Sequence, residues 1–378
     1  MRQIAFQAHW TPQNCHLQSH FKGIFQSQHL TICKKISLAF HRVIESICTH
    51  FCPPHVQSLI RSALVPSSLL QGALSSRLEQ EWIQKWEGPD AQGQWTQLRN
   101  AYTPIQMQLK TPDGANVNGI FYQSRATAER DIPTILCFTG NGGVLYSPSW
   151  DWLLKKGSQS TQPFHVIAVN YAMPDLKSAK DLVIYGETVF QAARESLGIS
   201  ETNLHFLGFS LGGAVAGLVH DLHPWAGRMI NYNSFDSLKG LIRSPASLLS
   251  DMVPHWLLRE LLAQATVPLG WHMEPKRALR QLKEKTLFIY NPQDEIIPPD
   301  ATAARATASL LDSIFRKHAA LEASDHVIPL KLRNGRAAPS SQHNAPLSLY
   351  EDGRGVSVSN RIVNFLLGRD IFPRSQPA

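Results

Sequence analysis

No stretch of the 378-residue sequence approaches the roughly 18 consecutive apolar residues that a membrane-spanning helix needs. The first seven residues also lack the long apolar core of a cleavable export signal. We therefore expect a cytoplasmic protein. Membrane association, or export by a route that uses no cleavable signal, is the alternative.

Cysteine and concentrated charge are both scarce. Five cysteines, an odd number, do not suggest the paired framework of a disulfide-stapled domain. Cys48 and Cys52 alternate with His50 and His55, but no second ligand pair follows at the spacing of a zinc finger, so we expect no metal site. The net charge of +7 is not gathered into a dense Lys/Arg block, and we expect no nucleic-acid partner.

Residues 1–100 have little of the alternation that marks strands. Apolar side chains recur at helical spacing over residues 36–51, and Pro53 ends the pattern. We expect a helical extension whose amphipathic helix packs on the main domain. Peripheral contact with a membrane, or with a partner, is the alternative for this helix.

From residue 101 to about residue 370, strand-like apolar runs alternate with helical patterns, which is typical of a mostly parallel sheet with helices on both faces. The pattern favours one α/β domain. Residues 240–270 interrupt it with many leucines and predict a small apolar cap insertion. The expected strands cover residues 105–110, 117–123, 134–138, 165–169, 204–207, 228–232, 286–290 and 327–332, the first two as an antiparallel hairpin.

Residues 208–213 read Gly-Phe-Ser-Leu-Gly-Gly and lie between an apolar strand and a helix of small residues. Strand, sharp turn and helix in this order indicate a nucleophile elbow, in which a serine occupies a strained backbone conformation. Gly208 and Gly212 lack the side chains that would hold strand and helix apart. Ser210 is therefore the candidate nucleophile.

A serine nucleophile needs a base, and an acid that orients the base. Asp294 follows an expected strand, at the sheet edge where α/β proteins bind ligands, and Glu295 is the weaker alternative. His343 follows the last expected strand and would lie at the same edge. His326 precedes that strand and would lie at the opposite edge, so it is the alternative base only if the last strand covers residues 319–323 instead.

Two backbone N–H groups must face the oxyanion that forms during acyl transfer. The elbow itself supplies the N–H of Leu211. The second donor is expected from the glycine-rich loop at residues 140–143, Gly-Asn-Gly-Gly, and we assign it to Asn141. These glycines are not followed by the Lys-Ser or Lys-Thr pair of a phosphate-binding loop.

These motifs resemble the α/β-hydrolase superfamily, in its chain order Ser, Asp, His, over roughly residues 101–370. They look closest to its α/β-hydrolase-domain serine hydrolases, which carry a His-Gly-Asn-Gly loop and a final Gly-His-Asn. Thr139 stands where that family often has His, and Gln342 where it often has Gly. The resemblance implies an eight-stranded, mostly parallel sheet with a cap or lid at residues 240–270.

The leading hypothesis is a serine hydrolase, without metal or cofactor, that cleaves an ester or thioester through an acyl-enzyme intermediate. An apolar cap favours a small-molecule lipid or acyl substrate. A serine peptidase of the same fold is the alternative enzyme. A non-catalytic interaction protein acting through residues 1–100 is the alternative outside enzymes.

Overall fold

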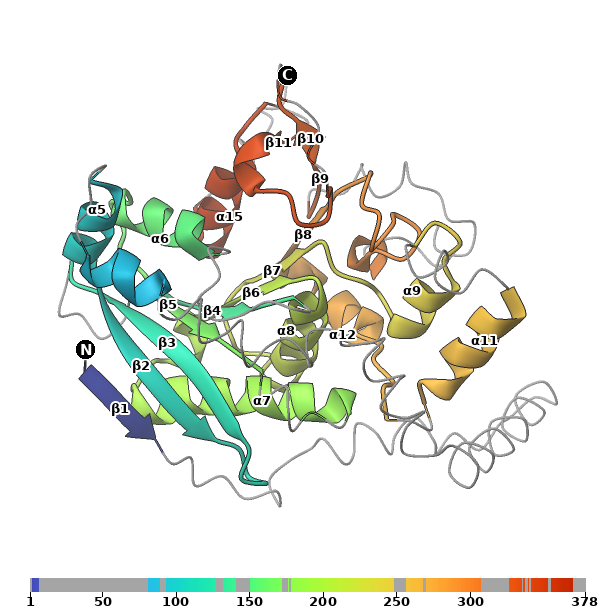
Figure 1. Cartoon of the computed structure of the whole chain (residues 1–378), viewed down its shortest axis with the longest axis horizontal. Helices are drawn as coiled ribbons and strands as arrows, with labels where there is room; N and C mark the ends of the chain where they lie inside the picture. The colour runs from blue at the N-terminus through green and yellow to red at the C-terminus, as the bar shows by residue number, and fades with distance from the viewer. Residues whose placement is uncertain are drawn as a thin grey trace.

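The structure is a computed structural model in which the described part of the chain forms a large mixed sheet covered by helices (Figure 1). The described residues are 2–6, 81–88, 93–126, 132–140, 150–171, 176, 178–247, 256–267, 270–306, 326–334, 336, 339, 341–352 and 355–369. No helix among them is both long and apolar enough to cross a membrane.

Within these residues the large sheet has nine strands in the order β1-β2-β3-β5-β4-β6-β7-β8-β9. Strand β3 runs antiparallel to both neighbours, and the other pairs are parallel. The strands are β1 (Arg2–Phe6), β2 (Tyr102–Lys110), β3 (Asn116–Ser124), β4 (Thr134–Phe138), β5 (His165–Val169), β6 (Leu204–Phe209), β7 (Met229–Tyr232), β8 (Thr286–Tyr290) and β9 (Val327–Pro329).

All eight strands expected from the sequence form, including the β2–β3 hairpin, and the mostly parallel sheet is confirmed. Strand β1 was not expected; it adds a ninth strand at the edge, parallel to β2. The last expected strand is shorter than predicted. Because β8 ends at Tyr290, the chain leaves it after Leu330 and forms β10 (Lys331–Leu332), which pairs with β11 (Tyr350–Glu351).

Helices cover both faces of the sheet, as predicted (Figure 1). The alternation of side chains along β4 explains this, because Leu136 and Phe138 enter one core while Ile135 and Cys137 enter the other. The helices are α5 (Gln94–Ala101), α6 (Asp151–Ser158), α7 (Ala179–Gln191), α8 (Leu211–Leu222), α9 (Leu238–Arg243), α11 (Trp256–Ala265), α12 (Lys276–Gln281) and α15 (Val358–Leu366).

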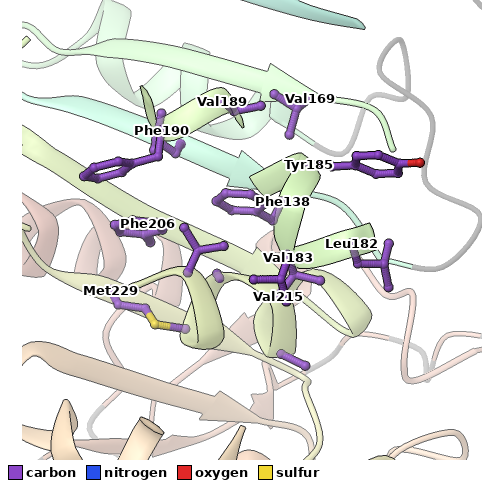
Figure 2. Packing of buried hydrophobic residues seen from close by; sticks show 14 of the residues in the cluster. Phe138, Val169, Leu182, Val183, Tyr185, Val189, Phe190, Phe206, Val215 and Met229 are labelled. Atoms are coloured by element: carbon purple, nitrogen blue, oxygen red, sulfur yellow. The ribbon is translucent and has the colours of Figure 1, made fainter. Parts of the chain in front are cut away.

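The first core lies between the sheet and helices α7 and α8 (Figure 2). Phe138 of β4 and Phe206 of β6 are stacked with centroids 6.0 Å apart, and Phe190 of α7 continues the stack at 5.9 Å. Val215 packs here from the helix that follows Ser210, and it is fully buried. The second core holds α6 and α15 against the opposite face. Burial on both sides fixes the central strands, which carry the candidate site.

The N-terminal region, expected to be a helical extension, contributes β1 and a helix over residues 81–87 to the described part of the chain. Trp82 and Trp86 stack at 5.5 Å, and both rings contact Tyr122 of β3. These aromatic contacts hold the helix on the sheet. The amphipathic helix expected at residues 36–51 lies outside the described residues.

The region expected to form the cap contributes helices α9 and α11, which lie beside one another at the side of the molecule far from β1 (Figure 1). Arg243 of α9 donates two hydrogen bonds to Glu260 of α11. Leu257 and Leu261 of α11 are exposed. Residues 248–255, between the two helices, lie outside the described residues.

Candidate active site

The turn between β6 and α8 holds Ser210 in a conformation that L residues rarely adopt, with φ 54° and ψ −123°. Its N–H donates to the carbonyl oxygen of Tyr232 at 2.9 Å, and its own carbonyl accepts from Gly213 at 3.0 Å. Strain of this kind persists only where the surroundings hold the backbone in place. The turn therefore presents the Ser210 side chain at the carboxyl end of the sheet.

Close backbone contacts explain why glycine occupies both flanking positions. A Cβ on Gly208 would lie 2.5 Å from the carbonyl oxygen of Gly212. A Cβ on Gly212 would lie 2.1 Å from the carbonyl oxygen of Phe138, at the end of β4. Neither distance is compatible with a side chain, so strand, helix and the end of β4 meet only because these positions are glycine.

The structure brings Ser210, His343 and Asp294 together in one hydrogen-bonded line. His343 Nε2 lies 3.0 Å from Ser210 Oγ, and His343 Nδ1 lies 2.7 Å from Asp294 Oδ2. The three residues follow β6, β10 and β8 respectively, and all three are buried. Segments that are far apart in the sequence therefore meet at one edge of the sheet.

The second carboxylate oxygen of Asp294 has partners of its own. Oδ1 accepts the N–H groups of Ile296 at 2.8 Å and Ile297 at 2.7 Å. Oδ2 is thereby directed at His343 Nδ1, and an ionised carboxylate there requires the proton to be on Nδ1. Nε2 is then left with a lone pair that can accept the Ser210 proton.

His326 lies at the opposite edge of the sheet. It directly precedes β9, and its carbonyl oxygen accepts the N–H of Phe288, the middle residue of β8. Its ring Nδ1 is 3.3 Å from the carbonyl oxygen of Thr286, and its Nε2 is 3.5 Å from Glu284. The structure therefore does not bring this alternative base to Ser210.

Three further residues hold the segment that carries His343, and they were not singled out from the sequence in this role. Glu295 Oε2 accepts the N–H of His343 at 3.3 Å, and Asn233 Nδ2 donates to the His343 carbonyl oxygen at 3.3 Å. The Phe209 ring packs on the imidazole with centroids 5.0 Å apart. The sequence signal that could have pointed to Asn233 is an Asn directly after an expected strand, because Asn tolerates a positive φ, here 44°.

Gln342, which replaces the Gly that the resemblance led us to expect, has a side chain that forms part of the support of the site. Its Oε1 accepts from the Tyr350 hydroxyl at 2.8 Å and from Asn291 Nδ2 at 3.1 Å. Asn291 Nδ2 also lies 3.1 Å from the Gln342 carbonyl oxygen. The larger residue is thus accommodated by partners from β11 and from the end of β8.

Of the two expected oxyanion donors, the structure describes one. Leu211 is the first residue of α8, so its N–H has no acceptor within the helix. Asn141 lies outside the described residues. Gly140, the last described residue before it, is so near the elbow that a Cβ there would lie 3.0 Å from Ser210 Cβ. Gly140, where the glycine-rich sequence begins, therefore lies directly beside Ser210.

Among the described residues, no group of three or more His, Cys, Asp or Glu side chains is arranged to hold a metal ion. The cluster formed by Cys48, His50, Cys52 and His55 lies outside the described residues.

A mixed sheet with two antiparallel pairs near one edge carries a strained serine after a central strand, an acid after a later strand and a histidine after the last. This order of elements, with the serine on a sharp turn from strand to helix, defines the architecture. The chain has the α/β-hydrolase fold. No family model and no curated protein sequence matches it.

Solved structures resemble the chain distantly. An esterase from Pyrococcus furiosus is 13% identical, with 53% of this chain and 74% of the esterase covered and a TM-score of 0.38. The acylaminoacyl peptidase of Pyrococcus horikoshii is 13% identical, with 57% of this chain and 36% of the peptidase covered and a TM-score of 0.42. An acetyl xylan esterase from Paenibacillus is 13% identical, with 51% and 69% covered and a TM-score of 0.39. At these scores the fold assignment rests on the topology and the elbow.

Proposed function

We propose that the protein is a serine hydrolase that cleaves a carboxylic ester or thioester. The observation that carries this proposal is the continuous line of hydrogen bonds from Ser210 Oγ through His343 to Asp294, with distances of 3.0 and 2.7 Å. Both distances are within the reach needed for proton transfer and for orienting the base. The strained φ of Ser210 adds support, because strain of this kind is concentrated at functional sites.

In the proposed reaction, His343 Nε2 takes the proton of Ser210 Oγ while that oxygen forms a bond to the acyl carbon. The N–H groups of Leu211 and Asn141 are proposed to hold the oxyanion. As the intermediate collapses, the imidazolium returns its proton to the departing alcohol or thiol. Water, deprotonated by the same imidazole, then attacks the acyl-enzyme, and the carboxylic acid leaves with Ser210 restored.

A lipid or other acyl substrate is the proposed class. Two hydrogen bonds join the start of the cap to the loop that carries Asp294: Ser244 Oγ donates to Asp300 Oδ1 at 2.7 Å, and Ser247 Oγ donates to the Ile296 carbonyl oxygen at 3.1 Å. The region that we propose as the cap therefore begins beside the site. Its leucine-rich sequence supports an apolar substrate, because acyl chains gain free energy from contact with apolar walls.

Labelling with a fluorophosphonate probe tests the proposal. We expect the native protein to be labelled and the Ser210→Ala variant not to be, because only a serine activated by a base reacts with such probes. Ser200→Ala is the matched control, since Ser200 is exposed and precedes β6 on the opposite edge of the sheet. Turnover of p-nitrophenyl esters of increasing chain length then reports the preferred acyl group.

An unlabelled native protein with a cooperative unfolding transition would contradict the hydrolase proposal. Labelling with turnover of amides in preference to esters and thioesters would contradict the substrate class while leaving the nucleophile in place.

A further inference from the structure

Two adjacent carboxylates, Asp294 and Glu295, contact the same segment of chain at different points. Asp294 contacts the imidazole of His343. Glu295 contacts the backbone of that segment: Oε1 accepts from the Ser341 hydroxyl at 2.5 Å, and Oε2 accepts the N–H groups of Gln342 at 3.0 Å and His343 at 3.3 Å. One carboxylate thus holds the ring while its neighbour holds the peptide that carries the ring.

The other polar group of the His343 backbone is held as well. Its carbonyl oxygen accepts from Asn233 Nδ2 at 3.3 Å. Asn233 is itself fixed, because its N–H donates to the Ile289 carbonyl oxygen at 2.8 Å and its Oδ1 accepts the N–H of Asn291 at 3.0 Å. His343 is therefore held at both its N–H and its C=O by side chains that follow neighbouring strands of the sheet.

The segment around His343 needs such support. It connects β10 to β11, two strands of two residues each, and its described part contains only a short 3-10 turn, Leu347–Leu349. Loops without regular hydrogen bonding move more readily than strands or helices. A displacement of about 1 Å between base and nucleophile can cost on the order of a hundredfold in rate.

We propose that Glu295 is a positioning residue, which couples the His343 segment to the loop that carries Asp294 so that acid and base keep their spacing to Ser210. This proposal rests on the hydrolase function proposed above. The Glu295 carboxylate bonds to the Ser341 hydroxyl and to the backbone of Gln342 and His343, so it acts on the base through the peptide that carries it. An ionised carboxylate suits this role, because it only accepts hydrogen bonds and here it faces only donors.

The charge state of Glu295 agrees with this arrangement. Burial alone would raise the pKa of Glu295, but the hydrogen bonds from Ser341 and from the N–H groups of Gln342 and His343 outweigh it and hold the pKa below its usual value. The carboxylate therefore stays ionised at neutral pH.

Two substitutions of Glu295 distinguish the reach of its carboxylate from its negative charge. Glu295→Gln keeps the shape but removes the charge: its amide oxygen can accept the N–H groups of Gln342 and His343 only as neutral, weaker hydrogen bonds, and its NH₂ group forces the Ser341 hydroxyl to accept instead of donate. Glu295→Asp keeps the charge but is too short to reach all three donors. Glu284→Gln is the control, since that carboxylate is exposed and lies in the 3-10 turn Lys283–Lys285 before β8. If Glu295→Gln fails to fold, Ser341→Ala removes a single one of the three hydrogen bonds.

We expect Glu295→Gln and Glu295→Asp each to lower kcat for the preferred ester by roughly 10- to 100-fold. KM should change less than about twofold, because ground-state binding is not affected. Ser341→Ala should show a smaller loss, and Glu284→Gln should keep the native rate. Native kcat in Glu295→Asp together with a loss in Glu295→Gln would mean that charge alone matters, and it would overturn the positioning role.

A readout that does not need activity is the ¹H–¹⁵N spectrum of the histidine rings, with His343 assigned by its absence in His343→Gln. The native ring should show a single tautomer with the proton on Nδ1, and both Glu295 variants should show a mixture. An unchanged tautomer with native kcat would overturn the proposal. A native protein without hydrolase activity, in which the Glu295 variants still change the tautomer, would remove the proposed function and leave the positioning role standing.

Discussion

At the scale of single residues, the two oxygens of Asp294 have different hydrogen-bond partners, and this difference decides which tautomer His343 adopts. Oδ1 accepts from the Ile296 and Ile297 N–H groups, and only Oδ2 faces the imidazole. The two backbone donors therefore fix the rotation of the carboxylate. A replacement for Asp294 must satisfy the same two donors before it can interact with His343.

This geometry predicts the effect of Asp294→Asn. The amide oxygen must take the Oδ1 position to accept both N–H groups, so the NH₂ group points at His343 Nδ1. Nδ1 then accepts, the ring proton moves to Nε2, and Nε2 can no longer take the Ser210 proton. We expect kcat to fall by about 10³- to 10⁴-fold with fold retained, measured by ester turnover and by the rate of fluorophosphonate labelling.

The control for this prediction is Asp113→Asn, because Asp113 is an exposed residue in the turn of the β2–β3 hairpin. It should retain the native rate. A kcat within tenfold of native in Asp294→Asn would argue against Asp294 as the group that sets the tautomer.

The sequence placed Ser210, Asp294 and His343 at the ends of expected strands, and the structure brings these three side chains within hydrogen-bond distance. It could not predict how Asn233 or Glu295 would be used. The Asn233–His343 contact joins residues 110 positions apart and depends on which strands are neighbours. Both side chains bind backbone groups of a distant segment. Almost every residue type offers the same backbone N–H and C=O groups, so such a contact leaves no recognisable pattern in the sequence.

At the scale of elements, the elbow is a junction of three segments. Strand β6 enters it, helix α8 leaves it, and the end of β4 passes so close that Gly212 is nearly in contact with the backbone of Phe138 and Thr139. The stability of the fold therefore requires glycine at position 212, whatever the chemical role of Ser210.

Gly212→Ala tests the junction. The new Cβ would lie 2.1 Å from the Phe138 carbonyl oxygen and 2.4 Å from that of Thr139, both backbone atoms of a buried strand end. Strand or helix must shift, and we expect the free energy of unfolding to fall by at least about 2 kcal/mol in denaturant titrations.

Gly217→Ala, on the same helix, is the matched control. Its Cβ would meet the end of the Leu279 side chain at 2.8 Å, and a leucine can change rotamer. Alanine also favours the helix by about 1 kcal/mol over glycine. We expect a change within about 1 kcal/mol, and equal losses in both variants would refute the account of the junction.

The elements show where local patterns suffice and where they do not. Central strands such as β4, β5 and β8 form as expected because each is an apolar run buried on both faces, whereas β2 alternates buried and exposed side chains and pairs with β3 in a hairpin. Strand β1 was missed because its five residues, Arg-Gln-Ile-Ala-Phe, become a strand only by pairing with β2, about a hundred positions further on. The last strand is shorter than predicted because its partner, β8, ends at Tyr290. The end of a neighbouring strand cannot be inferred from the residues of the last strand itself.

At the scale of the whole molecule, the edge of the sheet opposite the site contains two buried histidines that must stay neutral. His165 Nδ1 accepts the N–H of Ser124 at 3.0 Å, and His205 Nδ1 accepts the N–H of Arg228 at 2.9 Å. Burial lowers the pKa of each to about 4. Protonation would remove both acceptors and leave a buried charge in the sheet.

These pKa values predict acid sensitivity of the fold. In the unfolded chain a histidine takes up a proton near pH 6.5, whereas in the folded protein His165 and His205 do so near pH 4. Between these values the unfolded state binds more protons, so the free energy of unfolding falls as the pH is lowered from about 6.5 to about 4. Each histidine contributes a slope of up to about 1.4 kcal/mol per pH unit.

Denaturant titrations at pH 7.5, 6.0 and 5.0 (chosen to span about 1.5 units of this window) measure the effect in the native protein and in the double variant His165→Gln, His205→Gln. Glutamine can accept the same N–H groups without titrating, so the double variant should lose most of the slope. Asp151 acts in the opposite direction, because burial raises its pKa to about 6 and its protonation favours the folded state. Both proteins share that contribution, so the difference between their slopes isolates the two histidines, and equal slopes would show that they are not responsible.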